Sequence, residues 1–592
     1  MPDIGTQKKH DRLLLISVSS IFIASFYFSL NLGGAGLMVP NASTIWIAAT
    51  AMIAMGALML LSSDEIELPR YWIWLGLLPI GLVLSGLFSD TFRPIQWALR
   101  VGYLLGGFLF FFLLFQYHLS RRGAESLLFL IALTSFLHSS VVLLQIYGGE
   151  WLYGWIPYKT GNEHIGGMFQ QINLVASFAA TGLCTSAYLM TTPGYRGRST
   201  FYKIILYCNV ALLMAIILHT GSRTGLLGAG IGLLLLVFAR YRFLFRNKTT
   251  LVALLVALSA GVSFGNHLSQ DTEKIEVKFQ REGFENARLV VYRLSWELFL
   301  EKPFFGHGIG SFSRVFQEKR VAFQKEYPQA HLAPKMYSHP HNEILFWLVE
   351  NGVVAVAGMI ALMAATLLQL LSLGWQRGVA YAALILPVSL HVLVELPFYL
   401  SPLHWFIWLI ILYLIHHHHT VFHANSMSSS ARRFLSFSVI TAALVLFVFF
   451  MHTLYSINRL ARYAESGARD VAELARAAKN PALMDIGEAM LMSSLLYKDI
   501  LTGHTNNANR FVDWAEEFIS HTPSPMALAD LALAYAYLGK EKDAKRVIDA
   551  AVLIYNKSEM LIERKEQISA GTLIGDFRAR HKRGRAESSA SG

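Results

Sequence analysis

Long uninterrupted apolar runs constrain the fold of this chain more than any other feature of its sequence. Most of residues 13–455 divides into runs of roughly 16–25 hydrophobic residues, the length that a helix needs to cross a lipid bilayer. Lipid offers no partner to an unpaired backbone group, so each run can cross only as a helix. Because the runs are continuous rather than alternating, they exclude a β-barrel. The sequence therefore predicts an all-α, polytopic membrane protein.

About thirteen membrane-spanning helices are expected from these runs. The first run lacks a small-residue cleavage site and is expected to remain as an uncleaved anchor. The expected ranges are 13–32, 44–62, 72–89, 98–117, 124–147, 172–190, 204–219, 225–239, 250–264, 342–372, 378–398, 402–416 and 434–455.

Lysine and arginine gather in every second loop between these runs, beginning with Lys8, Lys9 and Arg12 at the amino terminus. Since basic loops stay on the cytoplasmic side, the alternation predicts a cytoplasmic amino terminus and a carboxy-terminal region on the outer side. The same loops account for the net charge of +11, so the charge predicts no nucleic-acid partner. Cys184 and Cys208 lie inside apolar runs and predict neither a disulfide nor a zinc site.

Two segments leave the membrane on the outer side and divide the chain. The expected parts are nine helices in 1–264, a large outer loop in 265–341, four helices in 342–455, a helical domain in 456–577 and a disordered tail in 578–592. The loop is longer than a connector needs to be, which favours a functional role. Residues 527–555 have the spacing of one tetratricopeptide-type helical hairpin, although a generic helical bundle fits them as well.

The segment 338–352 places His339, His341 and Asn342 where the outer loop enters a membrane helix. An imidazole at a helix amino terminus is biased towards its neutral form, which suits a general base. A histidine that is only hydrogen-bonded to backbone or water is an equal alternative. A metal site is disfavoured, because no cysteine or tight acidic cluster accompanies the two histidines.

Arginines on the outer side are candidates for binding an anion. Arg223 lies in the tight turn 220–225, and Arg288 and Arg293 lie on a helical pattern within the large loop. The planar guanidinium fork matches phosphate oxygens. An arginine that merely extends from the membrane to the interface is the alternative for Arg223.

Further polar residues stand at the ends of two expected helices. Gln171 lies at the outer start of the sixth helix, and His391, Glu395 and Tyr399 lie near the outer end of the helix 378–398. A separation of four residues puts His391 and Glu395 on one helical face, where they can pair. A structural polar clamp between helices is favoured over a catalytic role for this pair.

Together these motifs resemble the O-antigen ligase/polymerase superfamily of bacterial envelope enzymes. The resemblance covers residues 166–399 and rests on SRTG at 222–225, ARLVVYRLSWELFLEKPFFGHGIGSF at 287–312 and HPHNEILFWLVENG at 339–352. The Gln-x-Asn element at 171–173, the His-x-x-x-Glu-x-Pro-x-Tyr element at 391–399 and the helical extension look like those of protein O-oligosaccharyltransferases that glycosylate pilins. Ile172 stands where the family often has Pro, and Tyr292 where Trp is commoner.

The resemblance implies that an oligosaccharide is transferred from an undecaprenyl-pyrophosphate carrier to a Ser/Thr hydroxyl of an exported, pilin-like protein at the periplasmic face of the inner membrane. It implies no metal, cofactor or nucleic acid; the expected partners are the lipid-linked donor, the acceptor protein and membrane lipid. By correspondence His341 is the catalytic base, and Arg223 and Arg288 bind the donor pyrophosphate. The residues expected to orient donor or acceptor are Gln171, Tyr399 and Asn342. The secondary candidates are Arg293, His339, His391 and Glu395.

Three alternatives remain open on the sequence. Within the superfamily, the acceptor is lipid A–core for an O-antigen ligase and another glycan for an O-antigen polymerase. A flippase or transporter for lipid-linked glycans is the alternative from another class. A transporter is expected to show repeats with broken helices in both halves, and no such pair is visible in the sequence.

Overall fold

The computed structural model describes residues 4–27, 41–62, 65–89, 94–148, 166–270, 282–327, 332–333, 335–424, 428–466 and 470–590. These residues are almost entirely helical, as the apolar runs predict. Within them the one sheet is an antiparallel pair, β1 (Glu65–Pro69) with β2 (Thr420–Ala424), in which Glu67 lies opposite Phe422. The all-α membrane fold class is thereby confirmed.

Each of the expected spans coincides with at least part of a helix, although residues 28–32 of the first span lie outside the described residues. Among the described residues, nine helices are long and apolar enough to cross a membrane, and α3 and α16 are shorter apolar helices. The bundle helices are α1 (Ile4–Ala24), α2 (Asn41–Ser62), α3 (Trp72–Phe88), α4 (Pro94–Leu114), α5 (Arg121–Tyr147), α6 (Ile172–Met190), α7 (Thr200–Thr220), α8 (Arg223–Arg246), α9 (Lys248–Gln270), α13 (Glu343–Ser372), α14 (Trp375–His391), α16 (Pro402–His416) and α17 (Ser429–Glu465).

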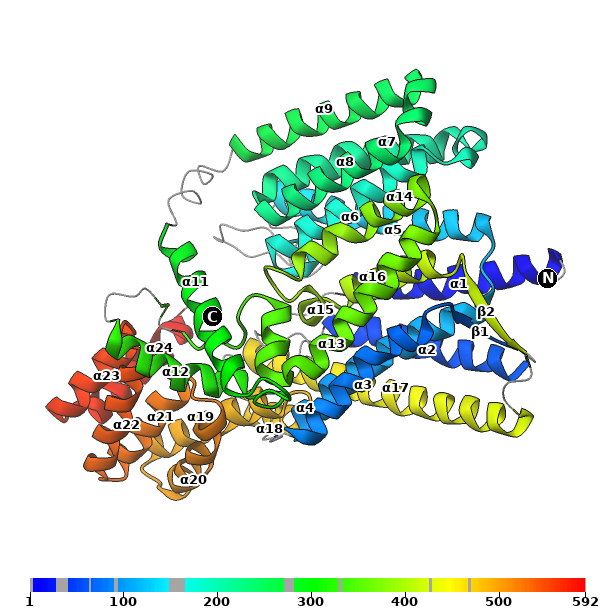
Figure 1. Ribbon diagram of the computed structural model, residues 1–592. Coiled ribbons are helices and arrows are strands. Elements are labelled where there is room, and N and C mark those ends of the chain that lie inside the picture. The colour runs from blue at the N-terminus through cyan, green and yellow to red at the C-terminus, as the bar shows by residue number, and fades with distance from the viewer. Residues whose placement is uncertain are drawn as a thin grey trace.

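These helices lie side by side in one bundle, with α13 packed along α3, α17 along α2, α7 along α9 and α14 along α8 (Figure 1). Glycines allow close approach: Gly81 of α3 and Gly358 of α13 each lie against the backbone of the other helix. Helix α6 is deeply enclosed, with every residue from Leu174 to Met190 buried. Large apolar side chains at the bundle surface, such as Phe434 of α17, are suited to contact with lipid.

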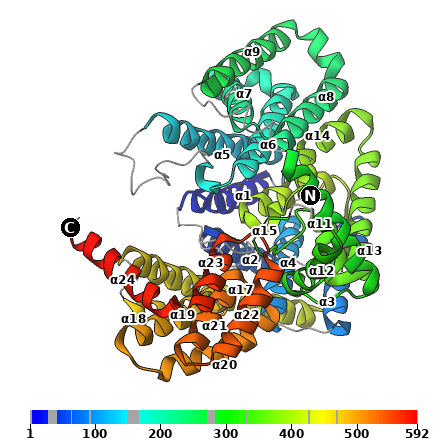
Figure 2. The ribbon, with the colours of Figure 1, turned by 90° about the vertical axis from the view of Figure 1, so that its left-hand side faces the viewer.

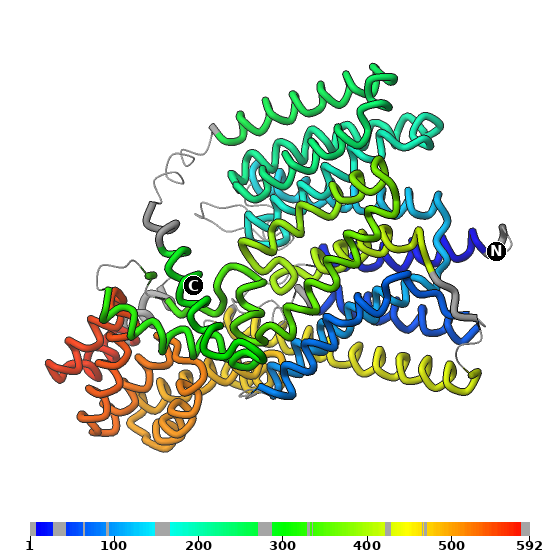
Figure 3. The backbone as a smooth tube through the Cα atoms, in the orientation of Figure 1, coloured from blue at the N-terminus to red at the C-terminus, as the bar shows by residue number. Residues whose placement is uncertain are grey.

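The remaining α-helices gather at one end of the bundle, which we call the outer end, while β1 and β2 lie at the opposite end (Figures 1 and 3). Two belong to the large loop, α11 (Glu282–Glu301) and α12 (Phe312–Glu326), and one short helix, α15 (Pro397–Leu400), follows α14. Residues 271–281, 328–331 and 334 of this loop lie outside the described residues. The carboxy-terminal helices are α18 (Val471–Ala477), α19 (Met484–Thr502), α20 (Asn506–His521), α21 (Pro525–Tyr537), α22 (Glu541–Ile554), α23 (Glu559–Ala570) and α24 (Leu573–Ala590).

Each carboxy-terminal helix packs on its neighbour in sequence, and α21 and α22 form a hairpin joined by a tight turn at Gly539. Helix α24 continues to Ala590, through the segment expected to be disordered from residue 578. Its many arginines and alanines favour a helix, and Phe577 packs against the domain core. Figure 2 views the molecule from the outer end, where these helices lie on the α17 side and leave α7 to α9 uncovered.

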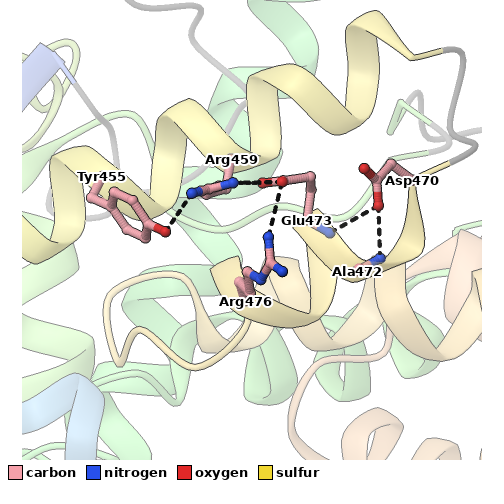
Figure 4. A network of polar contacts seen from close by, with 6 residues as sticks. All are labelled: Tyr455, Arg459, Asp470, Ala472, Glu473 and Arg476. Carbon is pink, nitrogen blue, oxygen red and sulfur yellow. Dashed lines mark hydrogen bonds and ion pairs between the residues drawn. The ribbon is translucent and has the colours of Figure 1, made fainter.

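The carboxy-terminal domain is attached to the bundle by contacts between α17 and α18. Helix α17 runs past the expected end of its span to Glu465, and Arg459 donates to Glu473 of α18 at 2.7 Å. Arg476 donates to the same carboxylate, Arg459 also donates to the hydroxyl of Tyr455, and Asp470 caps α18 (Figure 4). This network fixes the direction in which the domain leaves the membrane helix.

Candidate functional site

His341 occupies a constrained position at the outer end of α13. Its backbone has a positive φ of 56°, a conformation that non-glycine residues rarely adopt and that is enriched at functional sites. The next residue, Asn342, caps α13 by accepting from the Leu345 amide at 2.9 Å, and its side-chain amide donates to the Leu393 carbonyl at 2.9 Å. Asn342 therefore holds His341 against the segment that follows α14.

That segment supplies the partner of His341. The Nδ1 atom of His341 lies 3.1 Å from Oε2 and 3.2 Å from Oε1 of Glu395, whose carboxylate is buried. Nδ1 of His339 lies 3.6 Å from Glu395 Oε1, and the two imidazole rings are 4.6 Å apart. A carboxylate on Nδ1 fixes the tautomer that leaves the Nε2 lone pair available, which is the arrangement of a general base.

The expected pairing of His391 with Glu395 is not formed by a hydrogen bond. Helix α14 ends at His391, and the amides of Val394 and Glu395 both turn back onto the His391 carbonyl. The change of direction carries the Glu395 side chain to His341, while Nδ1 of His391 bonds to Ser177 Oγ at 2.8 Å. The backbones of His391 and Glu395 thus remain one turn apart, while their side chains take different partners.

Helix α11 brings its own polar residues towards this group. The Tyr292 hydroxyl donates to the His341 carbonyl at 3.2 Å. The tyrosine that stands where Trp is commoner therefore contacts the backbone of His341. Burial raises the pKa of Tyr292; the nearby Arg288 guanidinium opposes that rise and the Glu395 carboxylate adds to it. Arg288, one turn before Tyr292, is exposed at this end.

Arg293 is engaged elsewhere on α11. Its Nε donates to Glu297 at 3.0 Å, and its guanidinium lies over the rings of Phe323 and Tyr327. These contacts give Arg293 a packing role between α11 and α12, in contrast to the anion-binding role open to it on sequence.

The amino termini of α6 and α8 adjoin each other. Ser222 caps α8 by accepting from the Gly225 amide, and its hydroxyl donates to Asn173 Oδ1 at 2.9 Å. Gly225 is required here, because a Cβ would lie 2.4 Å from that of Ala176 in α6. Gln171 is the residue before α6 and Arg223 the first residue of α8. Two helix amino termini with a guanidinium form an environment that favours an anion.

A buried polar chain connects these termini to the His341 group. Ser177 Oγ of α6 lies 2.8 Å from His391 Nδ1 and 3.2 Å from His404 Nε2, and all three residues are buried. His391 is the residue from which the turn to Glu395 begins. Contacts therefore join the motifs at 171–173 and 222–225 and those at 339–352 and 391–399, and helix α6 links the two pairs through Ser177 and His391. Ser177 and His404 were not singled out from the sequence, although each is a polar residue inside an apolar run.

The glycine-rich stretch 306–310 docks onto a break in α13. Gly352 has φ 66° and ψ −166°, and the carbonyls of Val349 and Glu350 accept instead from the amides of His307 and Gly308, at 2.8 and 2.9 Å. A Cβ on Gly352 would lie 2.3 Å from the Phe304 carbonyl oxygen. Protein groups thus satisfy the irregular backbone, which lipid cannot do. Glu350 and Gly352, which lie two residues apart, both take part in this docking.

Glu350 and Arg100 lie beside the break and form a buried ion pair. Glu350 Oε1 also accepts from the amides of Gly310 and Phe312 at 3.0 and 3.1 Å. The Arg100 guanidinium lies 5.8 Å from the centre of the Tyr399 ring, which is half-buried near the outer end. Arg100 was missed on sequence, yet an arginine inside an apolar run is itself a functional signal.

Possible metal ligands are also present. In the described part of the chain, His339, His341 and Glu395 are the one group of three or more histidine, cysteine and acidic residues whose ligand atoms all lie within 4.8 Å of one another. On sequence a metal site at the two histidines is disfavoured because no acidic cluster accompanies them; Glu395, 54 residues from His341 in the chain, is the carboxylate that the fold adds.

Two family models match the chain. The model described as O-antigen ligase matches residues 208–360, which contain Arg223, Arg288 and His341. The model described as the C-terminal part of a virulence factor membrane-bound polymerase matches residues 379–567, which run from α14 to α23. No curated protein sequence matches the chain. The two matches support the O-antigen ligase/polymerase superfamily, and with it a membrane transferase that uses a lipid-linked glycan donor.

Proposed function

We propose that this chain transfers an oligosaccharide en bloc from an undecaprenyl-pyrophosphate carrier to a Ser/Thr hydroxyl of an exported protein such as a pilin. The reaction takes place at the periplasmic face of the bacterial inner membrane, with the amino terminus in the cytoplasm and the outer end in the periplasm. The observation that carries the proposal is the pairing of His341 with the buried carboxylate of Glu395 at the outer end. The arginine-rich loops and the two family matches support it.

His341 acts as the general base. Its Nδ1–H donates to Glu395, so Nε2 accepts the proton of the acceptor hydroxyl as that oxygen attacks the anomeric carbon of the donor. A new C–O bond to the acceptor forms while the bond between the anomeric carbon and the pyrophosphate oxygen breaks. Glu395 stabilises the imidazolium that results, and the proton later passes to solvent.

Arg223 and Arg288 stabilise the departing pyrophosphate. Both are exposed at the outer end, one on α8 and one on α11. Guanidinium groups and helix amino termini offset the negative charge that develops on the leaving group, which is the largest demand of this reaction. Because these groups supply the positive charge on the leaving pyrophosphate, the proposed reaction needs no metal or cofactor, and the lipid tail remains in the bilayer. Gln171, Asn342 and Tyr399 orient donor or acceptor around this centre.

The attachment of the carboxy-terminal domain favours a protein acceptor. Besides the network at Arg459, the buried Arg320 of α12 donates to the carbonyls of Ala333 and Lys335 and lies over the ring of Tyr555 from the domain. The domain is therefore fixed to the large loop as well as to α17. A rigid helical surface beside the site is suited to present a folded acceptor protein.

The test is co-expression of the chain with an exported pilin-like protein and a lipid-linked glycan, followed by intact mass measurement of the acceptor. The native chain is expected to add the mass of one glycan, His341→Ala is expected to add none, and the exposed His504→Ala is the matched control. A mass shift that persists in His341→Ala would remove the proposed base. If lipid A–core is modified and the protein is not, the chain is an O-antigen ligase. If the glycan crosses the membrane and no new glycosidic bond forms, the chain is a flippase.

An O-antigen polymerase is the second candidate, because the model that matches residues 379–567 is described as a polymerase. A polymerase joins glycan to glycan, so its product is a longer chain on the lipid carrier. Analysis of the carrier-linked glycan after incubation without protein acceptor separates the two. Elongation under those conditions favours the polymerase, and an unchanged glycan favours protein glycosylation.

A further inference from the structure

The group formed by His339, His341 and Glu395 has the geometry of a metal-binding set. Ligands on Zn²⁺ lie about 2.0–2.2 Å from the ion, so the donor atoms of a tetrahedral site stand roughly 3.4 Å apart. The measured separations to Glu395 are 3.1 Å from His341 Nδ1 and 3.6 Å from His339 Nδ1. All three donor groups lie within 4.8 Å of one another. Binding a metal would displace two existing contacts, from the His341 amide to His339 Nδ1 at 3.2 Å and between His341 Nδ1 and Glu395.

The chemistry of the donors selects the kind of ion. Two imidazoles and one carboxylate, with a fourth position open, suit Zn²⁺ and related divalent transition metals, whereas Mg²⁺ and Ca²⁺ prefer oxygen ligands. Glu395 is buried and brings one negative charge. The positive charges of Lys335 and Arg100 disfavour a further positive charge at His339. The charge of Arg100 is offset by its ion pair with Glu350.

We propose that these three side chains bind a divalent transition metal ion such as Zn²⁺, and that the bound ion switches the general base off. The switch rests on the proposed function. In the active tautomer the His341 proton is on Nδ1 and the lone pair is on Nε2. A metal on Nδ1 moves the ring proton to Nε2, with no net loss of protons. The neutral ring then has no lone pair for the acceptor hydroxyl, and Glu395 is withdrawn from its orienting role.

The binding test uses the full-length protein in detergent, freed of metal with a chelator, and adds Zn²⁺ or Co²⁺ alone. One ion per chain is expected, and Co²⁺ is expected to give the visible absorption of a four-coordinate site. His339→Asn is expected to weaken binding by more than the roughly 10–100-fold that loss of an outer-shell partner costs. The exposed His504→Asn is the matched control and is expected to bind as the native chain does.

Glu395→Gln is the second variant, so that a folding defect in one variant does not decide the result. Binding that survives both His339→Asn and Glu395→Gln would overturn the site. A Co²⁺ spectrum of a six-coordinate, water-exposed ion would overturn it as well.

The activity test measures glycan transfer while Zn²⁺ is titrated. The metal-free protein is expected to be active, to lose activity at the Zn²⁺ concentration that fills the site, and to recover with EDTA. For His339→Asn, activity is expressed relative to the metal-free rate of that variant. The Zn²⁺ concentration that halves this activity is expected to rise by the same factor as the Kd of the variant for Zn²⁺. Metal-free activity that is insensitive to bound Zn²⁺ would reject the switch and leave the proposed function standing. A protein that binds one ion per chain but has no transfer activity would support the metal site. It would reject both the proposed function and the switch.

Discussion

The guanidinium of Arg100 in α4 and the carboxylate of Glu350 in α13 form an ion pair in which the glutamate side chain is 1% exposed. The pair lies beside the break at Gly352, and Glu350 also holds the amides of Gly310 and Phe312. It therefore connects the helix that carries His341 at its outer end with both α4 and the large loop.

Arg100→Met is expected to destabilise the protein by about 3–5 kcal/mol, because it leaves a buried carboxylate without its counter-charge. The double variant Arg100→Met with Glu350→Gln removes that charge while keeping an oxygen for Gly310 and Phe312, so part of the loss is expected to return. Thermal unfolding in detergent measures both. Equal unfolding temperatures for the single and double variants would show that the pair is not what stabilises the break.

Gly352 and Gly374 form a matched pair for testing the break in α13. Both have glycine-specific backbone angles, φ 66° with ψ −166° and φ 77° with ψ 160°, so alanine at either site costs about 1–3 kcal/mol of backbone strain. Only Gly352 has backbone against it, since nothing lies within 4 Å of a Cβ on Gly374. Gly352→Ala is expected to lower the unfolding temperature well beyond Gly374→Ala and to release the loop 303–310 to proteolysis. Equal effects of the two variants would contradict the docking of that loop.

His307 is expected to make the outer loop sensitive to acid. Burial lowers the pKa of His307 below 6.5, while its Nε2–H donates to the Leu298 carbonyl at 2.9 Å. As the pH falls below 6.5, His307 becomes protonated in the unfolded chain before it does in the native loop. The free energy of unfolding is therefore highest above that pH and declines below it. His307→Gln keeps a donor without titrating. The native protein is expected to lose more unfolding temperature than His307→Gln between pH 7.5 and pH 5.5, and parallel losses would refute the assignment.

The helices could be predicted because lipid leaves an apolar run no other structure, and the ranges 172–190 and 402–416 agree with α6 and α16 to the residue. The end of α14 could not be predicted. The carbonyl of Val392, the residue after its last, accepts from the Glu343 amide at the start of α13, a partner distant in sequence. Likewise α17 continues past residue 455, where its Arg459 pairs with Glu473 of α18. A hydropathy pattern does not encode that contact.

The residues of the candidate site could be selected from the sequence by their chemistry, but their pairing could not. Local spacing favoured His391 as the partner of Glu395, whereas the folded chain gives Glu395 to His341. The cost of polar groups in lipid points to Arg100 as well, an arginine whose importance the family motifs did not reveal. Pairings across the bundle depend on where helices stop, and one-dimensional patterns carry little of that information.

Glu395→Gln is the most direct test of the proposed base. Glutamine fills the same space but cannot hold the Nδ1–H of His341 as a carboxylate does, so the imidazolium formed during transfer loses its stabilisation. The expected result is a fall in kcat by about 10²–10⁴, the range of general-base catalysis, with KM for the lipid-linked donor little changed because the arginines on the pyrophosphate are intact. The matched control is Glu297→Gln, at a carboxylate that is paired with Arg293 on α11. A rise in KM at unchanged kcat would mean that Glu395 contributes to substrate binding, and would contradict its role as the residue that orients the base.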